Sequence, residues 1–306
     1  MCIRDRPYLI ACALWLCILL GTCALCVRAL AILLDRSADV ALWTLAVGFA
    51  VIVIPFGELG SIEMAALLWM GVFLRRRAWT AAAVAGGFAM VLPHVGLPAV
   101  LGAFLFVPKM RARILALAVF LAALDVVPGG ARTALAYLTM VLPAHASSEI
   151  GSTAQLGLTW VLHGLGAGDR GAIAGGEASY AVMVILGLLA SRAIAMRVRD
   201  TGYFALIPPA FAVFGGTFIH FTQVMIAIPA ALLLCAHSRG SARNVFAASA
   251  LLLLFPWLWA LGQPLLILVY ALVTAIVARV ALGWDAMPAL RVALASTLLT
   301  GVILVA

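Results

Sequence analysis

The sequence predicts an all-α integral membrane protein, a polytopic bundle of about ten transmembrane helices. Two observations predict this class. The 306-residue chain is 66% hydrophobic and 10% charged, whereas a soluble domain is about half apolar and about a quarter charged. The apolar residues fall in repeated runs of about 15–25 residues, the length of transmembrane helices, rather than in the period-two alternation of a β-barrel.

Both ends of the chain are expected to be incomplete. Residues 1–6, Met-Cys-Ile-Arg-Asp-Arg, resemble the translated adapter sequence found at the ends of metagenomic contigs and are set aside as an artefact. Residues 7–306 then form a single transmembrane domain that begins mid-protein. Residues 298–306 end within an apolar run, so the C-terminus is expected to be cut as well.

Apolar segments follow one another along the chain, joined by short polar connections. Segment 62–74 is preceded by Glu58 and followed by three consecutive arginines, so it separates an acidic side from a basic side. The other apolar segments are 7–27, 40–55, 78–92, 95–107, 114–127, 180–189, 203–214, 218–235, 245–261, 265–277 and 293–306. The alternation predicts a chain that crosses the membrane back and forth.

Region 129–177 is the one long region that is not expected to span. It is expected to dip into the membrane around residues 134–142. Polar residues within it recur at helical spacing on one face, which predicts an extracytoplasmic interfacial helix with a polar stripe. The stripe consists of Ser152, Gln155, Thr159 and His163.

Positive charges lie almost entirely on one side of this topology. That side carries Arg28, Arg36, Arg75, Arg76, Arg77, Lys109, Arg111, Arg113, Arg192, Arg197, Arg199, Arg239, Arg243, Arg279 and Arg291. The other side carries only Arg132 and Arg170 beyond the artefactual N-terminus. The positive-inside rule makes the arginine side cytoplasmic. The net charge of +8 therefore reflects topology and does not indicate a nucleic-acid partner.

Most chemically useful side chains lie on the opposite face. They are Glu58, Glu63, Asp125, Glu149, Asp169 and Glu177, with His94, His145, His163 and His220. The preference for arginine over lysine indicates a GC-rich bacterial genome. We therefore expect a multi-pass protein of the bacterial inner membrane whose site faces the periplasm.

Each candidate side chain has a functional and a plain structural interpretation. Glu58 at a span boundary either faces a cavity, where it binds a polyol or acts as an acid or base, or is an interfacial acid in water. Glu63 lies in the first turn of a helix, where the macrodipole favours an anion, so the structural interpretation is preferred. His94 and His220 either bind a phosphate oxygen or relay a proton, or make an interhelical hydrogen bond. Asp125 is expected to pair with Arg132.

Several classes of site are excluded by the motifs. The sequence contains no Walker loop, zincin motif, nucleophile elbow or dinucleotide fingerprint in a plausible context. Cys23 and Cys26 have CxxC spacing, but no second pair accompanies them, so the cysteines are expected to be small apolar residues. No metal or other cofactor is expected.

An ordered pattern of motifs resembles glycosyltransferase family 87, a group of GT-C-type membrane mannosyl- and arabinosyltransferase-like enzymes. The pattern covers roughly residues 40–240. It consists of Gly57-Glu58, Leu74-Arg75-Arg76-Arg77-Ala78-Trp79, Gly86-Gly87, Leu92-Pro93-His94, Pro98 and Phe106-Val107-Pro108-Lys109, followed by segments 147–166 and 218–234 with His220. The resemblance implies a GT-C-like fold and the transfer of a hexose or pentose from a polyprenyl-phosphate sugar to a lipid-linked or cell-envelope acceptor.

The resemblance also implies roles for residues of this chain. His220, and then His94, would bind the phosphate, while Glu58 would bind sugar or acceptor. Gln155 and His163 are further candidates for substrate binding. The chain departs from the family pattern in having Glu58 for the usual glutamine and Pro93-His94 for the usual Lys-Pro pair. No residue matches the family's catalytic aspartate in the first extracytoplasmic loop, so the general base is expected to be missing with the N-terminus.

Two other classes of function stay open. A secondary transporter or lipid flippase would need polar residues near the middle of the membrane and broken helices in repeated halves. A non-catalytic subunit of envelope assembly would need no base. An outward-facing cavity that holds Glu58, His94 and His220 would favour the transferase.

Overall fold

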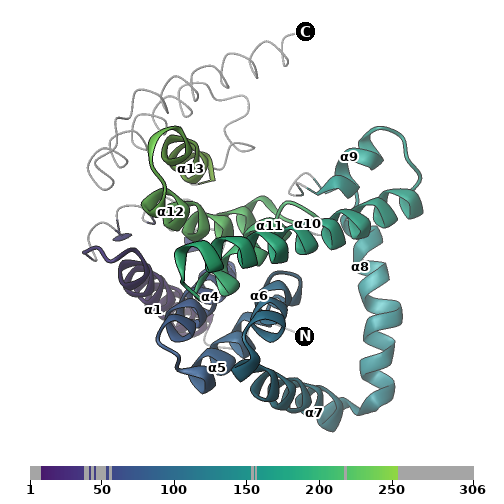
Figure 1. The fold of residues 1–306 in the computed structure, drawn as a ribbon. Helices are drawn as coiled ribbons and strands as arrows, with labels where there is room; N and C mark the ends of the chain where they lie inside the picture. The colour runs from purple at the N-terminus through teal and green to yellow at the C-terminus, as the bar shows by residue number, and fades with distance from the viewer. Residues whose placement is uncertain are drawn as a thin grey trace. The chain divides into compact units, whose positions relative to one another are not determined.

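The computed structural model describes residues 8–37, 41, 42, 45, 53, 54, 57–152, 155, 157–216 and 219–253. All elements in these residues are helical apart from an isolated antiparallel bridge between Gln155 and His220, which confirms the all-α class. The helices (Figure 1) are α1 (Tyr8–Leu34), α4 (Gly60–Arg75), α5 (Trp79–Ala89), α6 (Pro93–Phe106), η3 (Pro108–Met110), α7 (Arg111–Ala136), η4 (Tyr137–Val141), α8 (Leu142–Glu149), α9 (Leu158–Gly164), α10 (Asp169–Val198), α11 (Tyr203–Ala212), η5 (Phe221–Ala227), α12 (Ile228–His237) and α13 (Gly240–Leu253). The expected spans 265–277 and 293–306 lie outside the described residues.

Two of the described helices, α1 and α10, are long and apolar enough to cross a membrane. A bent pair, Pro108–Leu124 with Gly129–Glu149, is a third candidate if it counts as one span. The other apolar helices have 10–17 residues, so they are at most about 26 Å long and shorter than a hydrocarbon core of about 30 Å. The structure therefore supports a helical membrane protein, and the number of about ten spans stays a prediction.

The chain forms two compact units. Unit 1 comprises Met1–Ala65 and Ala231–Ala306, and unit 2 comprises Ala66–Ala230. In unit 1, α1 lies along the turn that leads into α4. The Trp15 indole donates a hydrogen bond to the Gly57 carbonyl at 2.9 Å, and the Thr22 and Ser61 hydroxyls are 2.8 Å apart.

Helices α6 and α10 run parallel in unit 2. The Tyr180 hydroxyl of α10 donates to the His94 carbonyl at the start of α6, and the Arg192 guanidinium lies over the Phe106 ring at the end of α6. The two contacts are twelve residues apart on both helices, or about 18 Å along the axis. One end of this pair therefore carries a histidine and the other carries an arginine.

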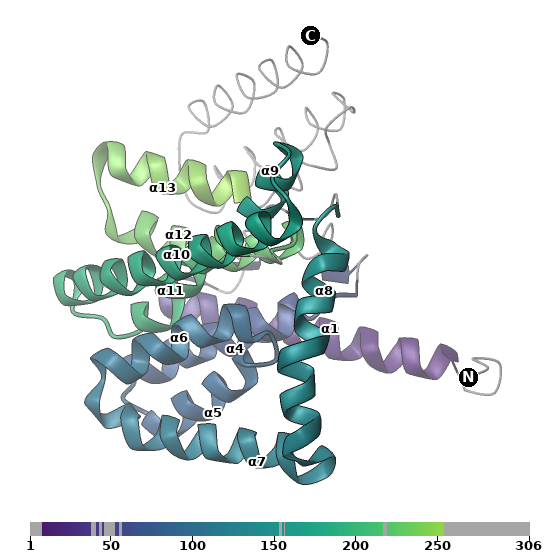
Figure 2. The same cartoon turned by 90° about the vertical axis from the view of Figure 1, so that its right-hand side faces the viewer.

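Helix α11 returns beside α10, and the two views show them side by side (Figures 1 and 2). The approach is close because Gly187 of α10 has no side chain. A Cβ atom there would lie 2.9 Å from the Cα of Pro208 and 2.9 Å from the Cβ of Phe211. Small residues allow helix backbones to approach closely in this way in membranes.

The outer face of α10 has the character of a lipid-facing surface. Val182, Ile185 and Leu189 recur at helical spacing and are 54%, 56% and 59% exposed. The buried face of the same helix instead carries small residues such as Gly187 and Ser191. An apolar outer stripe over a small-residue inner face is typical of membrane helices.

Helix α7 bends sharply before it continues into α8, as Figure 2 shows. Pro108–Leu124 and Gly129–Glu149 make an angle of 98°. The bend follows from the sequence because Pro128 removes a helical hydrogen-bond donor and Gly130 adopts φ 73°. The region around residues 134–142, expected to dip into the membrane, is helical throughout.

Three local predictions are wrong. The first span does not end before Arg28, because α1 continues to Leu34 with Arg28 on its exposed side and ends where Asp35 takes φ 52°. The predicted polar stripe is not on one helix, because α9 begins only after an extended Gly157 and Gln155 is paired in a bridge. His220 precedes η5 rather than lying one turn into a helix.

Candidate functional site

Unit 2 contains a cluster of polar side chains that come from distant parts of the chain. We call it the histidine cluster; it consists of His94, Glu149, Gln155, Tyr180, His220 and Gln223. Three of these residues, His94, Gln155 and His220, were predicted from the sequence. The cluster is built around the end of α6 that is opposite Arg192.

Glu149, Gln155 and His220 form one half of the cluster. The His220 Nε2 atom lies 3.7 Å from the Glu149 Oε2 atom. The Gln155 side-chain amide donates to the Glu149 carbonyl at 2.8 Å, and the Gln155 backbone pairs with that of His220. Gln155 therefore holds both the end of α8 and the start of η5, and so brings the carboxylate beside the imidazole.

Gln223 joins His220 to His94 in the other half. Its Oε1 atom accepts a hydrogen bond from the His220 backbone N–H at 3.2 Å, and the His94 Nε2 atom lies 3.2 Å from the same oxygen. Because an amide oxygen only accepts, Nε2 of His94 carries the proton in this contact. Tyr180 then ties His94 to α10 through the His94 carbonyl.

The tautomer of His220 is set by a capping box at the start of η5. The His220 side chain accepts from the Gln223 backbone N–H while the Gln223 side chain accepts from the His220 N–H. The ring nitrogen within reach of the backbone is Nδ1, so the proton of a neutral ring lies on Nε2. His220 thus presents an N–H towards Glu149, at a distance too long for a hydrogen bond.

Unit 2 also contains buried hydrogen-bonding atoms without partners, one of them within this network. Within the described part of the chain they include Gln155 Oε1, Thr159 Oγ1 and Thr222 Oγ1. These three residues are only 1–2% exposed. Most buried polar atoms in native proteins are hydrogen-bonded, so such a group of exceptions indicates a place that water or a ligand's hydroxyl groups can occupy.

An apolar groove of about 250 Å³ lies between α6 and α7. Its lining includes Leu97, Val100, Leu101 and Phe104 of α6 with Leu117 and Leu121 of α7. His94 is three residues before Leu97 and seven before Leu101, so it belongs to the same face of α6. The groove and the histidine cluster therefore follow one another along this helix.

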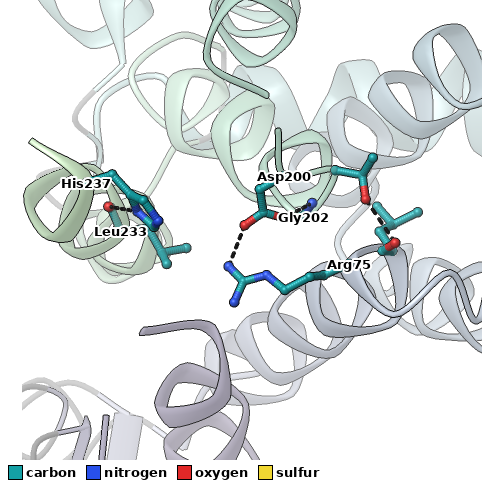
Figure 3. Close-up of polar contacts among 7 residues, drawn as sticks. Arg75, Asp200, Gly202, Leu233 and His237 are labelled. Carbon is teal, nitrogen blue, oxygen red and sulfur yellow. Dashed lines mark hydrogen bonds and ion pairs between the residues drawn. The ribbon is translucent and has the colours of Figure 1, made fainter. Parts of the chain in front are cut away.

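The opposite end of unit 2 is basic and well paired (Figure 3). Arg75 at the end of α4 forms an ion pair with Asp200, whose other oxygen accepts from the Gly202 N–H at 2.8 Å. The Thr201 hydroxyl donates to the Leu74 carbonyl at 2.9 Å. Both carboxylate oxygens of Asp200 are thus engaged: one holds α4 through Arg75 and the other fixes the connection between α10 and α11 through Gly202.

The other two predicted site residues are placed differently. Glu58 lies in unit 1, half-buried in the turn after Gly57. His163 lies in α9, where its Nδ1 atom is 3.5 Å from the Asp169 Oδ1 atom. The described structure thus brings together His94, Gln155 and His220, whereas the described contact of His163 is with Asp169.

Sequence reasoning did not select Glu149, Gln223 or Tyr180 as site residues. The His220-x-x-Gln223 spacing was a usable signal, because it has the form of a capping box with histidine at the N-cap. Glu149 and Tyr180 gave no local signal. Their role depends on contacts between segments that are far apart in the sequence.

No protein-family model, curated protein or solved structure matches the chain. The resemblance to glycosyltransferase family 87 therefore stays an expectation from the ordered motifs, and the geometry of the histidine cluster carries the functional argument.

Proposed function

We propose that this protein is a membrane glycosyltransferase with a GT-C-like bundle of about ten spans. It moves a mannose-like sugar from a polyprenyl-phosphate donor to a lipid-linked or cell-envelope acceptor on the periplasmic face of a bacterial inner membrane. The observation that carries the proposal is the buried Gln155 amide oxygen, which lacks a partner among the described residues, beside the Glu149–His220 pair. Amide, carboxylate and imidazole groups are the side chains that bind sugar hydroxyls.

The two histidines have different roles in this proposal. A phosphate at His220 would lie near the Glu149 carboxylate, and like charges at such short distance repel. His94, whose ring has its described hydrogen bond with the neutral Gln223 amide, suits the departing phosphate better. His220 and Gln155 then lie on the side of the sugar and its acceptor.

The apolar groove suits the polyprenyl chain of the donor. Its lining named above is wholly apolar and includes Leu97 and Leu101, which follow His94 on the same face of α6. A phosphate at His94 with an isoprenoid chain along Leu97, Leu101 and Phe104 matches the order of polar and apolar groups in such a lipid. Burial of a chain in this groove contributes about 0.8 kcal/mol for each methylene removed from water.

The test is sugar transfer by the full-length chain in proteoliposomes. Polyprenyl-phosphate [¹⁴C]mannose is the donor, with the same lipid carrying arabinose as a second probe, and a bacterial glycolipid extract supplies the acceptor. We expect labelled product and release of polyprenyl phosphate. Substitution of Gln155 by leucine should lower the rate about 10-fold to 100-fold, because it removes the free amide oxygen. Absence of turnover of both donors by the wild-type chain would refute the proposal.

A proton-coupled transporter is the second candidate, and Glu63 of unit 1 favours it. This residue is 0% exposed, and neither carboxylate oxygen has a hydrogen-bond partner in the described residues. Ionisable groups buried in membrane proteins often mark ion pathways. Proton flux into proteoliposomes under a pH gradient tests this function: flux that is abolished by Glu63→Gln would support it, and flux equal to that of empty vesicles would exclude it.

A further inference from the structure

We propose that the segment Gly129–Glu149, which we call the arm, is embedded in the bilayer leaflet on the side of the histidine cluster. Its partner is the boundary between the lipid headgroups and the acyl chains. The inference does not rest on the proposed function, because it concerns where the arm lies and not what the protein catalyses. It follows from the direction of the arm, from its exposed side chains and from the hydrogen bonds of its hydroxyl groups.

The arm runs across the direction of the helices that can span a membrane. It makes an angle of 98° with Pro108–Leu124, which comprises η3 and the first part of α7. That part of α7 lies beside α6 along the apolar groove, and α6 runs parallel to the long apolar helix α10 (Figure 2). Spanning helices are tilted by about 20° on average from the bilayer normal. The arm therefore lies close to the plane of the membrane.

Both ends of the arm lie on the side of the histidine cluster. Helix α7 starts at the basic end of α6 and returns along it towards His94, so the arm begins on the His94 side. At its other end, Glu149 lies 3.7 Å from the His220 ring, and the Gln155 side chain donates to the Glu149 carbonyl at 2.8 Å. The arm is about 30 Å long, so its two ends are fixed while its middle crosses this side of unit 2.

The middle of the arm is apolar and exposed on all sides. Five of its large apolar side chains are each more than half exposed, namely Leu135, Tyr137, Leu138, Met140 and Val141. They include neighbouring and alternate positions, so they surround the helix instead of forming one stripe. A helix that is apolar all round belongs in a protein core or in a membrane.

Three hydroxyl groups of the arm are bonded within the arm itself. The Thr139 hydroxyl donates to the Leu135 carbonyl at 2.8 Å. The Ser147 and Ser148 hydroxyls donate to carbonyls four and three residues before them, at 3.1 Å and 2.9 Å. Serine and threonine bond to the preceding turn in this way in transmembrane helices, where lipid chains offer no partner. These hydroxyls are therefore suited to surroundings without water.

The charged residues of the arm limit how deep it lies. Residues 133–144 carry no charge, whereas Arg132 precedes them and His145 and Glu149 follow. An apolar stretch of about 10–14 residues is typical of re-entrant or interfacial segments. Long arginine side chains near its end can reach the headgroups. These lengths place the arm about 5–10 Å into the boundary between headgroups and acyl chains.

The experiment measures depth by tryptophan fluorescence in the whole chain. Leu138→Trp in the arm is compared with Ile185→Trp, whose position is exposed in the middle of α10. Both are reconstituted into phosphatidylcholine vesicles whose acyl chains carry bromine either near the headgroup or near the chain end. The wild-type signal in the same vesicles is subtracted, because the chain has 8 tryptophans of its own.

We expect the two positions to lose fluorescence in opposite orders. Bromine near the headgroup should quench Leu138→Trp more strongly than bromine near the chain end, and Ile185→Trp should show the reverse. Leu135→Trp lies one turn earlier on the arm and should repeat the order of Leu138→Trp; it replaces that variant if Leu138→Trp does not fold.

Three outcomes would overturn the inference. If neither lipid quenches the tryptophan of the arm, water, another part of the chain or a second copy covers it. If bromine near the chain end quenches it more strongly, the arm reaches the bilayer centre. If Ile185→Trp is quenched mainly near the headgroup, α10 does not span and the arm has no membrane plane to follow. No outcome depends on sugar transfer, so the proposed function is decided separately.

Discussion

The two ends of unit 2 both gather polar side chains, yet they use them differently. At the basic end, Asp200 engages both oxygens, one with Arg75 and one with the Gly202 N–H. At the histidine cluster, the Glu149 carboxylate has no hydrogen bond in the described residues and Gln155 Oε1 has no partner there. A carboxylate with both oxygens engaged holds neighbouring segments together, whereas a buried amide oxygen without a partner is ready for a ligand. We therefore assign a structural role to the basic end and a functional role to the histidine cluster.

The largest expected effect is a difference in chemical labelling between the two ends, because we expect them to lie on opposite sides of the membrane. Glu177 and Arg197 are both exposed on α10 and lie about 30 Å apart along the helix. In intact bacterial cells, a membrane-impermeant maleimide should label Glu177→Cys and leave Arg197→Cys at the wild-type background. Equal labelling of both would contradict a periplasmic histidine cluster.

Loss of the Asp200 contacts at the basic end should lower stability strongly. Asp200→Ala removes the ion pair to Arg75 and the bond to Gly202, and hydrogen bonds to charged groups are worth about 1.5–3 kcal/mol. We expect a loss of that size in the free energy of unfolding, measured by chemical denaturation in detergent. A loss under about 0.5 kcal/mol would show that the basic end does not hold α4 in place.

Close packing between α10 and α11 should matter somewhat less. Gly187→Ala places a Cβ atom 2.9 Å from Pro208 and Phe211, and overpacking of this kind costs about 1–2 kcal/mol. Gly171→Ala on the same helix meets nothing within 4 Å and is the matched control. Equal thermal unfolding of the two variants would argue against this helix contact.

The smallest effect is expected at a single hydroxyl near the histidine cluster. Ser179 accepts the Gly216 N–H at 3.1 Å, so Ser179→Ala should cost about 1 kcal/mol of stability. Ser249→Ala is the control, because the described hydrogen bond of the Ser249 hydroxyl is to the Val245 carbonyl of its own helix. A loss of stability in Ser179→Ala no larger than that in Ser249→Ala would show that this hydrogen bond does not stabilise the fold.

The sequence allowed some features of the fold to be predicted for clear physical reasons. The all-α class and the two helices long and apolar enough to span, α1 and α10, follow from long apolar runs, because bilayer thickness sets the length of a span. The separation of arginines from histidines across the membrane follows from charge counting and stays a prediction; within unit 2, His94 lies at one end of α6 and Arg192 lies beside the other end. These features depend on the composition of whole segments, which can be read directly from the sequence.

Other features depend on geometry that the sequence does not state. Helical spacing at Gln155 predicted a polar stripe, whereas Gly157 interrupts the helix and a backbone bridge decides the position of Gln155. The pairing of Glu149 with His220 requires the bend around Gly130 that turns α7 into α8. Residue types were enough to select candidates, but not to show which of them would meet.

The most direct test of the difference between the two ends compares the His220→Ala variant with the Asp200→Ala variant. Each is assayed for sugar transfer from polyprenyl-phosphate mannose per folded molecule and for its unfolding midpoint. We predict that His220→Ala loses about 100-fold in transfer rate and keeps the wild-type midpoint, while Asp200→Ala loses stability and keeps its rate. A His220→Ala protein that transfers sugar at the wild-type rate would contradict the assignment of chemistry to the histidine cluster.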